Sequence, residues 1–261
     1  MKAISLARNY IRLETSLYRE AAEKSPRVAK RRFPTGRQRI WLRRTARLSK
    51  WLDQNGVEVP AKIMSPYELD VLERCRARIP LKYQYRALNA LREMARTHVL
   101  FPELLAGDEP AEIIDLSAGG CGNADVLGQY GHKVEVCDYH DANAINPVGH
   151  SYTEIHKFLG LECRFFDGRD LPYAFPDESH DIVLVYQAID AYGPVALWYD
   201  IVDELLRIAR RSVGLVLNPA VPRTTENEAL MAAFIQDMRR DRNAFVSTCP
   251  ETSLPALRID K

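Results

Sequence analysis

A turn of small residues in the middle of the chain is the stretch best suited to bind a ligand. An apolar run from residue 111 breaks into this turn, and helical spacing resumes after it. Its small residues are Ser117, Gly119, Gly120 and Gly122. Glycine permits positive φ and close approach of a ligand, and the next helix begins with free N–H groups at its positive end. The pattern predicts a strand, a tight loop and a helix that bind a nucleotide-type ligand.

Asp115, at the end of the predicted strand, helps to decide which ligand this is. The spacing Ser117-x-Gly119-x-x-Gly122 matches the dinucleotide fingerprint with serine for its first glycine, and a lone match of this kind is weak evidence. A carboxylate two residues before the turn would repel a pyrophosphate but attract the sulfonium and ammonium groups of S-adenosylmethionine. The charge therefore favours the methyl donor, with a nicotinamide dinucleotide as the alternative.

Further candidate residues follow later strands. Residues 132–138 are typical of a second strand, and Asp138 closes it at about the spacing at which an acid binds ribose hydroxyls. Asp167 precedes a Leu-Pro turn, and residues 181–186 predict a strand that ends at Tyr186. In open parallel sheets, ligands bind beyond the carboxyl ends of the strands. The residues with the highest expectation of function there are Asp115, Ser117, Gly119, Asp138, Asp167 and Tyr186.

In this order the motifs resemble those of the class I S-adenosylmethionine-dependent methyltransferases. That family usually has an acid with a Gly-rich loop, an acid ending strand two, an Asp before a Leu-Pro-Phe-like turn, and a Phe-Asp-led strand four. The same order covers roughly residues 107–218 here, with a tail to residue 261. The resemblance implies S-adenosylmethionine as cofactor, with Asp138 on the ribose, Asp167 on the adenine amino group and Gly168 admitting the adenine ring. The structural alternatives are a solvated strand-end acid for Asp138 and an Asx turn for Asp167.

The chain departs from the family pattern at three positions. Ser117 and Cys121 stand where the family often has glycine, and His180 stands where an aromatic residue commonly precedes the Asp of strand four. We expect Cys121 to fill space in the loop, because methyl transfer from a sulfonium needs no covalent enzyme intermediate.

Candidate catalytic residues follow the second and fourth strands. Methyl transfer depends mainly on in-line positioning, and an acceptor of high pKa also needs a base. His140, Asp190 and Tyr192 are the candidate bases, and the alternative for each is a pocket wall or a capping residue. The histidines have no metal-ligand spacing, so no metal is expected. No Asn-Pro-Pro-Tyr follows strand four, which disfavours amino groups of nucleic-acid bases as acceptors.

Composition predicts an ordinary globular protein. The chain has 261 residues, of which 46% are hydrophobic and 27% charged, enough for one sizeable domain and an accessory region. No apolar run has the length of a membrane span, and the N-terminus lacks the apolar core of a secretory signal, so we expect a cytoplasmic protein. Five widely spaced cysteines without a C-x-x-C pair indicate reduced thiols.

Charge divides the chain unevenly. Residues 1–50 carry fifteen Lys and Arg residues against three acids, a balance of +12, although the net charge of the whole chain is only +1. Basic amphipathic helices with Trp41 and Trp51 predict contact with an anionic lipid, a phosphorylated glycan or RNA. The alternative is a solvated face or an internal partner for the acidic remainder of the chain.

Residues 1–106 predict a helical, basic N-terminal region, and residues 107–261 predict a methyltransferase-like domain. Helices are expected at residues 6–17, 65–79, 81–99, 151–159, 194–211 and 226–240. A basic helix with Trp41, Leu48, Trp51 and Leu52 on its apolar side is expected to follow a break at residues 30–39 and to stop at Gly56. Strand five is expected at residues 212–217, and the last two strands at 244–248 and 256–259. The alternation of strands and helices predicts an α/β fold with a Rossmann-like, doubly wound, mostly parallel sheet.

The leading function is transfer of a methyl group from S-adenosylmethionine to an unidentified acceptor, with a hydroxyl of a small molecule or glycan favoured. Two alternatives stay open. One is an NAD(P)-dependent Rossmann oxidoreductase, which Asp115 opposes. The other is a non-catalytic binding module that retains the fold, consistent with the departures at Ser117 and Cys121.

Overall fold

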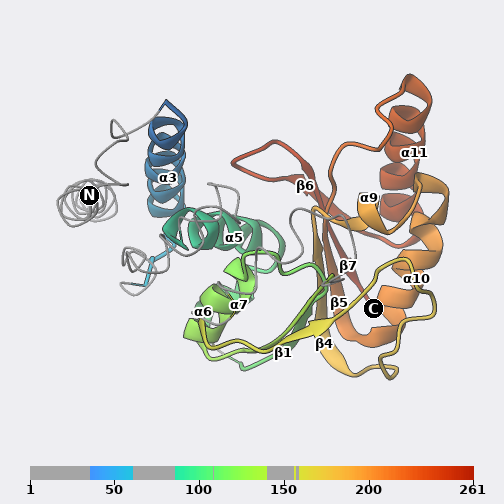
Figure 1. Ribbon diagram of the computed structural model, residues 1–261, viewed down its shortest axis with the longest axis horizontal. Helices are drawn as coiled ribbons and strands as arrows, with labels where there is room; N and C mark the ends of the chain where they lie inside the picture. The colour runs from blue at the N-terminus through green and yellow to red at the C-terminus, as the bar shows by residue number, and fades with distance from the viewer. Residues whose placement is uncertain (1–35, 61–85, 108, 140–155, 157–158) are drawn as a thin grey trace, which may run out of the picture. The chain divides into compact units, whose positions relative to one another are not determined.

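The computed structural model describes residues 36–60, 86–107, 109–139, 156 and 159–261 (Figure 1). The chain divides into two compact units: residues 1–95, 120–126 and 141–161 form the first, and residues 96–119, 127–140 and 162–261 form the second. The helices expected at residues 6–17 and 65–79, and most of the helix at 151–159, lie outside the described residues. Among the helices that are described, none has the length and apolar character to cross a membrane.

The second unit is built on a sheet of seven strands in the described residues, with the order β3-β2-β1-β4-β5-β7-β6. The strands are β1 (Glu112–Asp115), β2 (Lys133–Asp138), β3 (Cys163–Phe165), β4 (His180–Tyr186), β5 (Ala209–Val216), β6 (Phe245–Thr248) and β7 (Pro255–Asp260). The pairs among β1 to β5 are parallel, and β7 runs antiparallel to both β5 and β6. The predicted Rossmann-like, mostly parallel sheet is confirmed.

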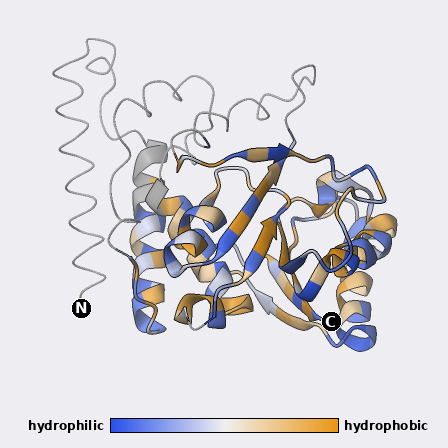
Figure 2. Cartoon of the chain, turned by 90° about the horizontal axis from the view of Figure 1, so that it is seen from below, coloured by the Kyte–Doolittle hydropathy of each residue, from blue (hydrophilic) through white to orange (hydrophobic). Residues whose placement is uncertain are grey.

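The middle residues of the central strands are apolar because both faces of the sheet are covered, as expected for buried parallel strands. Successive side chains of a strand point to opposite faces. In β4, Val183 and Val185 belong to one apolar cluster, and Ile182 and Leu184 belong to the other. Hydrophobic residues accordingly run along the strands in the middle of the sheet (Figure 2).

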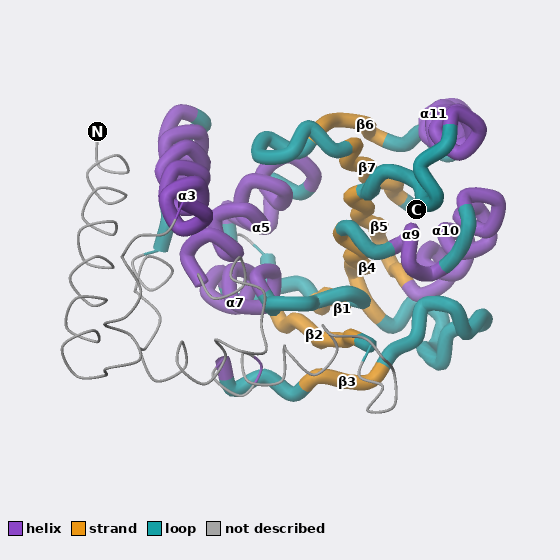
Figure 3. The backbone as a smooth tube through the Cα atoms, turned by 45° about the horizontal axis from the view of Figure 1, so that its top comes forward, coloured by secondary structure: helices purple, strands orange, loops and turns teal. Residues whose placement is uncertain are grey.

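One face of the sheet is covered by helices that follow β4 and β5. They are α9 (Ile189–Tyr192), the 3-10 helix η4 (Val195–Leu197), α10 (Trp198–Ile208) and α11 (Thr225–Asp241). Figures 1 and 3 both show α10 and α11 on the same side of the sheet. Trp198 of α10 and Phe234 of α11 meet edge to face, with ring centroids 5.4 Å apart. Thr224 caps α11, because its hydroxyl accepts a hydrogen bond from the backbone N–H of Asn227.

The other face packs against the end of α5 (Arg86–Leu100) and against α6 (Glu103–Ala106). A 3-10 helix, η2 (Gly128–Tyr130), contacts α6. Phe101 is fully buried there. A Cβ added at Gly214 of β5 would lie 2.6 Å from the Phe101 ring, so glycine at this position lets the ring lie directly on the strand.

The described part of the first unit contains α3 (Gly36–Gln54), most of α5 and most of α7 (Gly122–Leu127). The basic helix predicted after residues 30–39 is confirmed as α3, although it begins earlier, at Gly36, and its apolar side buries Leu48 and Leu52. Gly56 has φ +75° just beyond this helix, as expected for a C-terminal stop. The helix expected at residues 81–99 is confirmed from Arg86 onward.

One boundary was wrong. The sequence predicts a helix to residue 211 and a strand from residue 212, but α10 ends at Ile208 and β5 begins at Ala209. Ala209 has extended dihedral angles and pairs with His180 at the start of β4. Arg210 and Arg211 are exposed and look like the basic last turn of a helix, yet pairing with the neighbouring strand determines their conformation. The strands expected at residues 244–248 and 256–259 are confirmed as β6 and β7.

The cysteines within the described residues are free thiols, as the sequence predicts. Burial is the main cause that raises the pKa of the Cys163 thiol to about 12, so it is protonated at neutral pH. Cys121 and Cys137 are buried. Cys75 lies outside the described residues.

Candidate functional site

Asp115 and Asp138 end neighbouring parallel strands, β1 and β2, at the carboxyl edge of the sheet. The sheet order reverses between β1 and β4, and ligands of doubly wound folds bind at such a point. Asp115 is only 2% exposed, and its carboxylate accepts a 3.3 Å hydrogen bond from the backbone N–H of Ser117. A buried carboxylate therefore lies directly under the start of the small-residue turn.

The turn curls over the end of β2 and is held by its acid. The backbone N–H of Ala118 donates to the carbonyl of Cys137 at 3.0 Å. The N–H of Gly119 donates to Asp138 Oδ2 at 2.7 Å, and the N–H of Tyr139 donates to Asp138 Oδ1 at 2.7 Å. Gly119 has φ +47°, which glycine adopts without strain. The sequence-predicted loop and the sequence-predicted ribose acid are thus parts of one hydrogen-bonded unit.

Tyr192, from α9, lies between this turn and the loop after β3. Its hydroxyl donates to the carbonyl of Leu116 at 2.8 Å, so the short contact with Ser117 has the serine hydroxyl as donor. Its ring lies on Gly168: a Cβ added there would be 2.1 Å from Tyr192 Cδ1. Burial is the main cause that raises the Tyr192 pKa well above its ordinary value, so the phenol is protonated at neutral pH.

Asp167 precedes Gly168 in the loop after β3, and an arginine two residues on engages its carboxylate. Arg169 Nε donates to Asp167 Oδ1 at 2.8 Å and Arg169 Nη2 donates to Oδ2 at 2.5 Å. These hydrogen bonds are the main cause that lowers the pKa of Asp167. The Arg169 guanidinium also lies 5.3 Å from the ring centre of Tyr139, which follows Asp138 in sequence. The carboxylate expected to meet an adenine amino group is therefore paired with Arg169.

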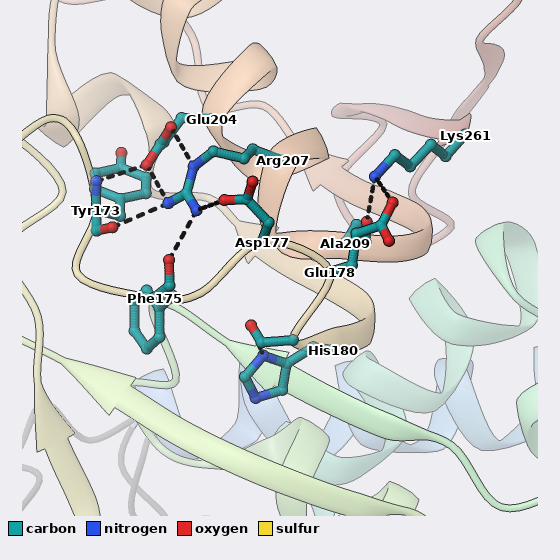
Figure 4. A network of polar contacts seen from close by, with 10 residues as sticks. Tyr173, Phe175, Asp177, Glu178, His180, Glu204, Arg207, Ala209 and Lys261 are labelled. Atoms are coloured by element: carbon teal, nitrogen blue, oxygen red, sulfur yellow. Dashed lines mark hydrogen bonds and ion pairs between the residues drawn. The ribbon is translucent and has the colours of Figure 1, made fainter.

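The loop between β3 and β4 is anchored by Arg207, near the end of α10 (Figure 4). Its guanidinium donates to the carboxylate of Glu204 at 2.6 and 2.9 Å and to Asp177 Oδ1 at 2.5 Å. It also donates to the carbonyls of Phe175 at 2.8 Å and Tyr173 at 3.0 Å. The planar, multiply donating guanidinium suits this role, and it fixes the segment that leads away from Gly168.

Asp190 precedes Tyr192 by two residues in α9, beyond the carboxyl ends of β4 and β5. Asn218 Nδ2 donates to Asp190 Oδ1 at 3.1 Å and to the carbonyl of Gln187 at 2.9 Å. Burial is the main cause that raises the pKa of Asp190, against the hydrogen bond from Asn218, which lowers it. Asn218 was not among the residues predicted to be functional. Its place just after strand five, at the carboxyl edge, was the signal that could have identified it.

The structure brings together the predicted residues Asp115, Ser117, Gly119, Asp138, Asp167, Gly168 and Tyr192. Tyr186 ends β4 but belongs to the apolar cluster on the face opposite to α10. Gly120 follows Gly119 in the turn, and His140 lies outside the described residues. No group of three His, Cys, Asp or Glu residues within the described ranges is arranged to hold a metal ion.

No protein-family model matches the sequence, and no curated protein sequence matches it. Solved structures with a similar fold include a SAM-dependent methyltransferase from Aquifex aeolicus, at 14% identity and a TM-score of 0.39, over 64% of this chain and 91% of that chain. They also include magnesium protoporphyrin IX methyltransferase from Synechocystis PCC 6803 with bound SAH, at 14% identity and a TM-score of 0.45, over 74% of this chain and 94% of that chain. The likeness is one of fold.

Two of the departures from the methyltransferase pattern have a local explanation. Ser117, where the family often has glycine, uses its hydroxyl to contact Tyr192. Cys121, also at a frequent glycine position, has φ +54°, so the backbone keeps the left-handed conformation that glycine would favour. The turn therefore retains its shape with these two side chains present.

Proposed function

We propose that the protein is an S-adenosylmethionine-dependent methyltransferase. The observation that carries the proposal is the hydrogen bond from the Gly119 N–H to Asp138, which joins the small-residue turn to the strand-end acid. Asp115 lies buried beneath the turn. In its ionised form it would repel a dinucleotide pyrophosphate and attract a sulfonium and an ammonium group.

The residues present fit this cofactor. Each carboxylate oxygen of Asp138 can accept more than one hydrogen bond, so the backbone donors leave capacity for ribose hydroxyls. The φ of Gly119 keeps the turn open to close approach. Asp115 and the turn from Ser117 to Gly120 would hold the aminoacyl end of the cofactor, and Asp167 would lie beside its adenine ring. Tyr186 would support the end of β4. S-adenosylmethionine, when bound, supplies an electrophilic methyl group.

For the acceptor we propose a hydroxyl of a small molecule or glycan, with Asp190 as its base. A hydroxyl needs a proton acceptor, and burial gives Asp190 a raised pKa, which makes its carboxylate more basic. Tyr192 is kept protonated by burial and donates to Leu116, so it serves as a wall and a hydrogen-bond donor. His140, which follows β2 in sequence, remains a second candidate base.

The test is to identify what the purified protein binds. Mass spectrometry of ligand released from the protein, followed by calorimetry with S-adenosylhomocysteine, NAD and NADP, separates the candidate functions. We expect S-adenosylhomocysteine to bind and the dinucleotides not to bind. Tight binding of NAD would overturn the proposal in favour of an oxidoreductase. If neither S-adenosylhomocysteine nor a dinucleotide binds, the remaining candidate is a non-catalytic binding module that retains the fold.

We further propose that the basic N-terminal segment recruits an anionic acceptor or surface. In α3, Arg43, Arg44, Arg47 and Lys50 are exposed, whereas Leu48 and Leu52 are buried. Replacing Arg31, Arg32, Arg43 and Arg44 with Gln should leave cofactor affinity unchanged but weaken binding to anionic vesicles or RNA. Wild-type binding should fall steeply with salt, because the screening length shortens to about 3 Å at 1 M. Binding that is independent of salt would contradict this role.

A further inference from the structure

A chain of polar side chains leads from the protein interior to Asp190. Arg96, near the end of α5, donates to Glu251 Oε1 from Nη2 at 2.7 Å and from Nε at 3.0 Å. The same Nη2 donates to Gln187 Oε1 in a short hydrogen bond. Gln187 Nε2 donates to Asn218 Oδ1 at 3.0 Å, and Asn218 Nδ2 donates to Asp190 Oδ1 at 3.1 Å.

Because Arg96 can only donate, every hydrogen bond in this chain is donated toward Asp190. A guanidinium has only donors, so the group it meets on Gln187 must be the amide oxygen. The amide NH₂ of Gln187 then faces Asn218, whose oxygen must accept, and the NH₂ of Asn218 faces Asp190. Arg96 thereby orients the amide of Gln187. Gln187 orients the amide of Asn218 twice, through its side-chain NH₂ and through its backbone carbonyl, which accepts from Asn218 Nδ2. Asp190, the last residue of this chain of hydrogen bonds, must therefore accept a hydrogen bond through a carboxylate oxygen.

The surroundings hold this arrangement firmly. Arg96 is 1% exposed, and its charge is matched by the carboxylate of Glu251 in the turn between β6 and β7. Gln187 has φ +61°, and its backbone is held on both sides. Its N–H donates to the carbonyl of Val216 at 2.6 Å, and its own carbonyl accepts from Asn218. Gln187, Asn218 and Asp190 are half-buried, so the oriented end of the chain reaches the accessible edge of the sheet.

We propose that Arg96, Gln187 and Asn218 are positioning residues that keep the Asp190 carboxylate a hydrogen-bond acceptor aimed at the hydroxyl of the methyl acceptor. This inference rests on the proposed methyl transfer. In the step, the acceptor O–H bond breaks and its proton passes to Asp190. The oxygen electron pair forms the new bond to the methyl carbon, and the electron pair of the broken C–S bond stays on sulfur, which becomes a neutral thioether.

Few charges compete with Asp190 for this proton. The titratable groups of the cluster are Arg96 and Glu251, which form an ion pair, and the phenols of Tyr186 and Tyr192 on adjoining segments. The Tyr192 phenol is held protonated by burial. The pKa of Asp190 should therefore depend on the hydrogen bond that Asn218 donates to it.

The experiment is a ¹³C-carboxyl NMR titration of Asp190 in the full chain, with Asp190→Asn to assign the signal. Gln187→Met removes the hydrogen bond to Asn218 Oδ1 without a change of charge. Asn218 is then held by the backbone carbonyl of residue 187 without the side-chain link, so its donation to Asp190 should weaken and the Asp190 pKa should rise. Asn227→Ala, which removes an exposed amide on α11, is the matched control and should leave the titration unchanged.

A raised Asp190 pKa in Gln187→Met supports the proposal. An unchanged or lowered Asp190 pKa in this neutral variant overturns it, because a purely structural link would cost stability without moving the titration. If Gln187→Met does not fold, Asn218→Ala, at a half-buried site, must raise the pKa instead. Calorimetry with S-adenosylhomocysteine on the wild type tests the proposed function separately, and its failure would not alter the titration.

Discussion

The two edges of the central sheet use acidic residues in different ways. At the amino edge, arginine, lysine or histidine side chains meet the acids. Arg210 pairs with Glu112 at 2.7 Å and with Asp181 at 2.9 Å, and Glu135 pairs with His180 at 3.1 Å. Hydrogen bonds from Arg210 and Lys133 lower the pKa of Glu112, which is therefore held in its charged form.

At the carboxyl edge, Asp167 is paired with Arg169, but neutral groups donate to Asp115, Asp138 and Asp190. Backbone N–H groups donate to Asp115 and Asp138, and the amide of Asn218 donates to Asp190. The pKa of Asp190, in the helix after β4, is raised, whereas that of Asp181, near the start of β4, is lowered. For Asp181, hydrogen bonds from Glu112 and Arg210 outweigh the opposing effect of burial.

This difference separates acids that form structural ion pairs from acids that can bind a ligand. An exposed ion pair contributes little and commits its carboxylate to a partner. A carboxylate held by neutral donors keeps its negative charge for a cationic or hydroxyl-bearing ligand. Perturbed titratable groups in such settings mark functional sites more often than chance. We therefore propose that ligands bind at the carboxyl edge, and variants at the two edges should have different effects.

The largest effect should come from Asp138→Ala. Loss of charge-assisted hydrogen bonds to ribose should weaken S-adenosylhomocysteine binding by about 1.5 to 3 kcal/mol, roughly 10- to 150-fold in Kd. Asp138→Asn should also weaken binding while it retains an acceptor for the Gly119 N–H. Asp181→Ala, at the amino edge, is the control and should leave the affinity unchanged. If calorimetry gave the wild type and all three variants the same affinity for S-adenosylhomocysteine, the two edges would not differ in ligand binding.

Gly168→Ala tests how tightly the carboxyl edge is packed. The new Cβ would meet the ring of Tyr192 at 2.1 Å, so we expect a loss of about 1 to 3 kcal/mol in the free energy of unfolding. Gly128→Ala is the matched control, because a Cβ there meets no atom within 4 Å. Urea denaturation provides the measurement. Recovery of stability in the double variant Gly168→Ala/Tyr192→Leu would show that the ring is the cause.

Much of this fold is predictable from the sequence because the strands are apolar on both faces and end in recognisable turns. The strands ending at Asp115, Asp138 and Tyr186 were all placed correctly. The boundary at Ala209 was missed because an alternating pattern does not show how far the neighbouring strand extends. Tertiary pairing overrides local preference in such places.

The contacts of the candidate site were less predictable. Motif order identified Asp138 and the turn, but it did not show that Gly119 donates to that acid. Gly168 was expected to admit an adenine ring, and the ring that lies on it in the structure is that of Tyr192. The partnership of Arg96 with Gln187 joins residues far apart in the chain and has no local sequence signal.

Arg207→Met tests the anchor of the loop between β3 and β4. The variant leaves the carbonyls of Tyr173 and Phe175 without this donor, and we expect a loss of about 1 to 2 kcal/mol in the free energy of unfolding. Arg242→Met is the control, because Arg242 forms an exposed pair with Asp203 and should matter little. Chemical denaturation of both variants checks the prediction. Equal losses would mean that the number of hydrogen bonds to the guanidinium is irrelevant.

The smallest effect should come from Arg210→Gln. The pH dependence of its stability tests whether ion pairs stabilise the amino edge. Arg210 helps to lower the folded-state pKa values of Glu112 and Asp181 below their unfolded values, which are about 4. A lowered pKa contributes stability above the unfolded value, and that contribution is lost as pH falls through the folded value. The wild type should therefore be slightly more stable than Arg210→Gln at pH 7, and the two should converge as the pH is lowered below 4. Urea midpoints measured at pH 7 and pH 3 test this, with cofactor affinity at pH 7 expected to be equal. A difference that persists at pH 3 would mean that Arg210 acts through packing of its stem, and the contrast between the two edges would then not be one of charge.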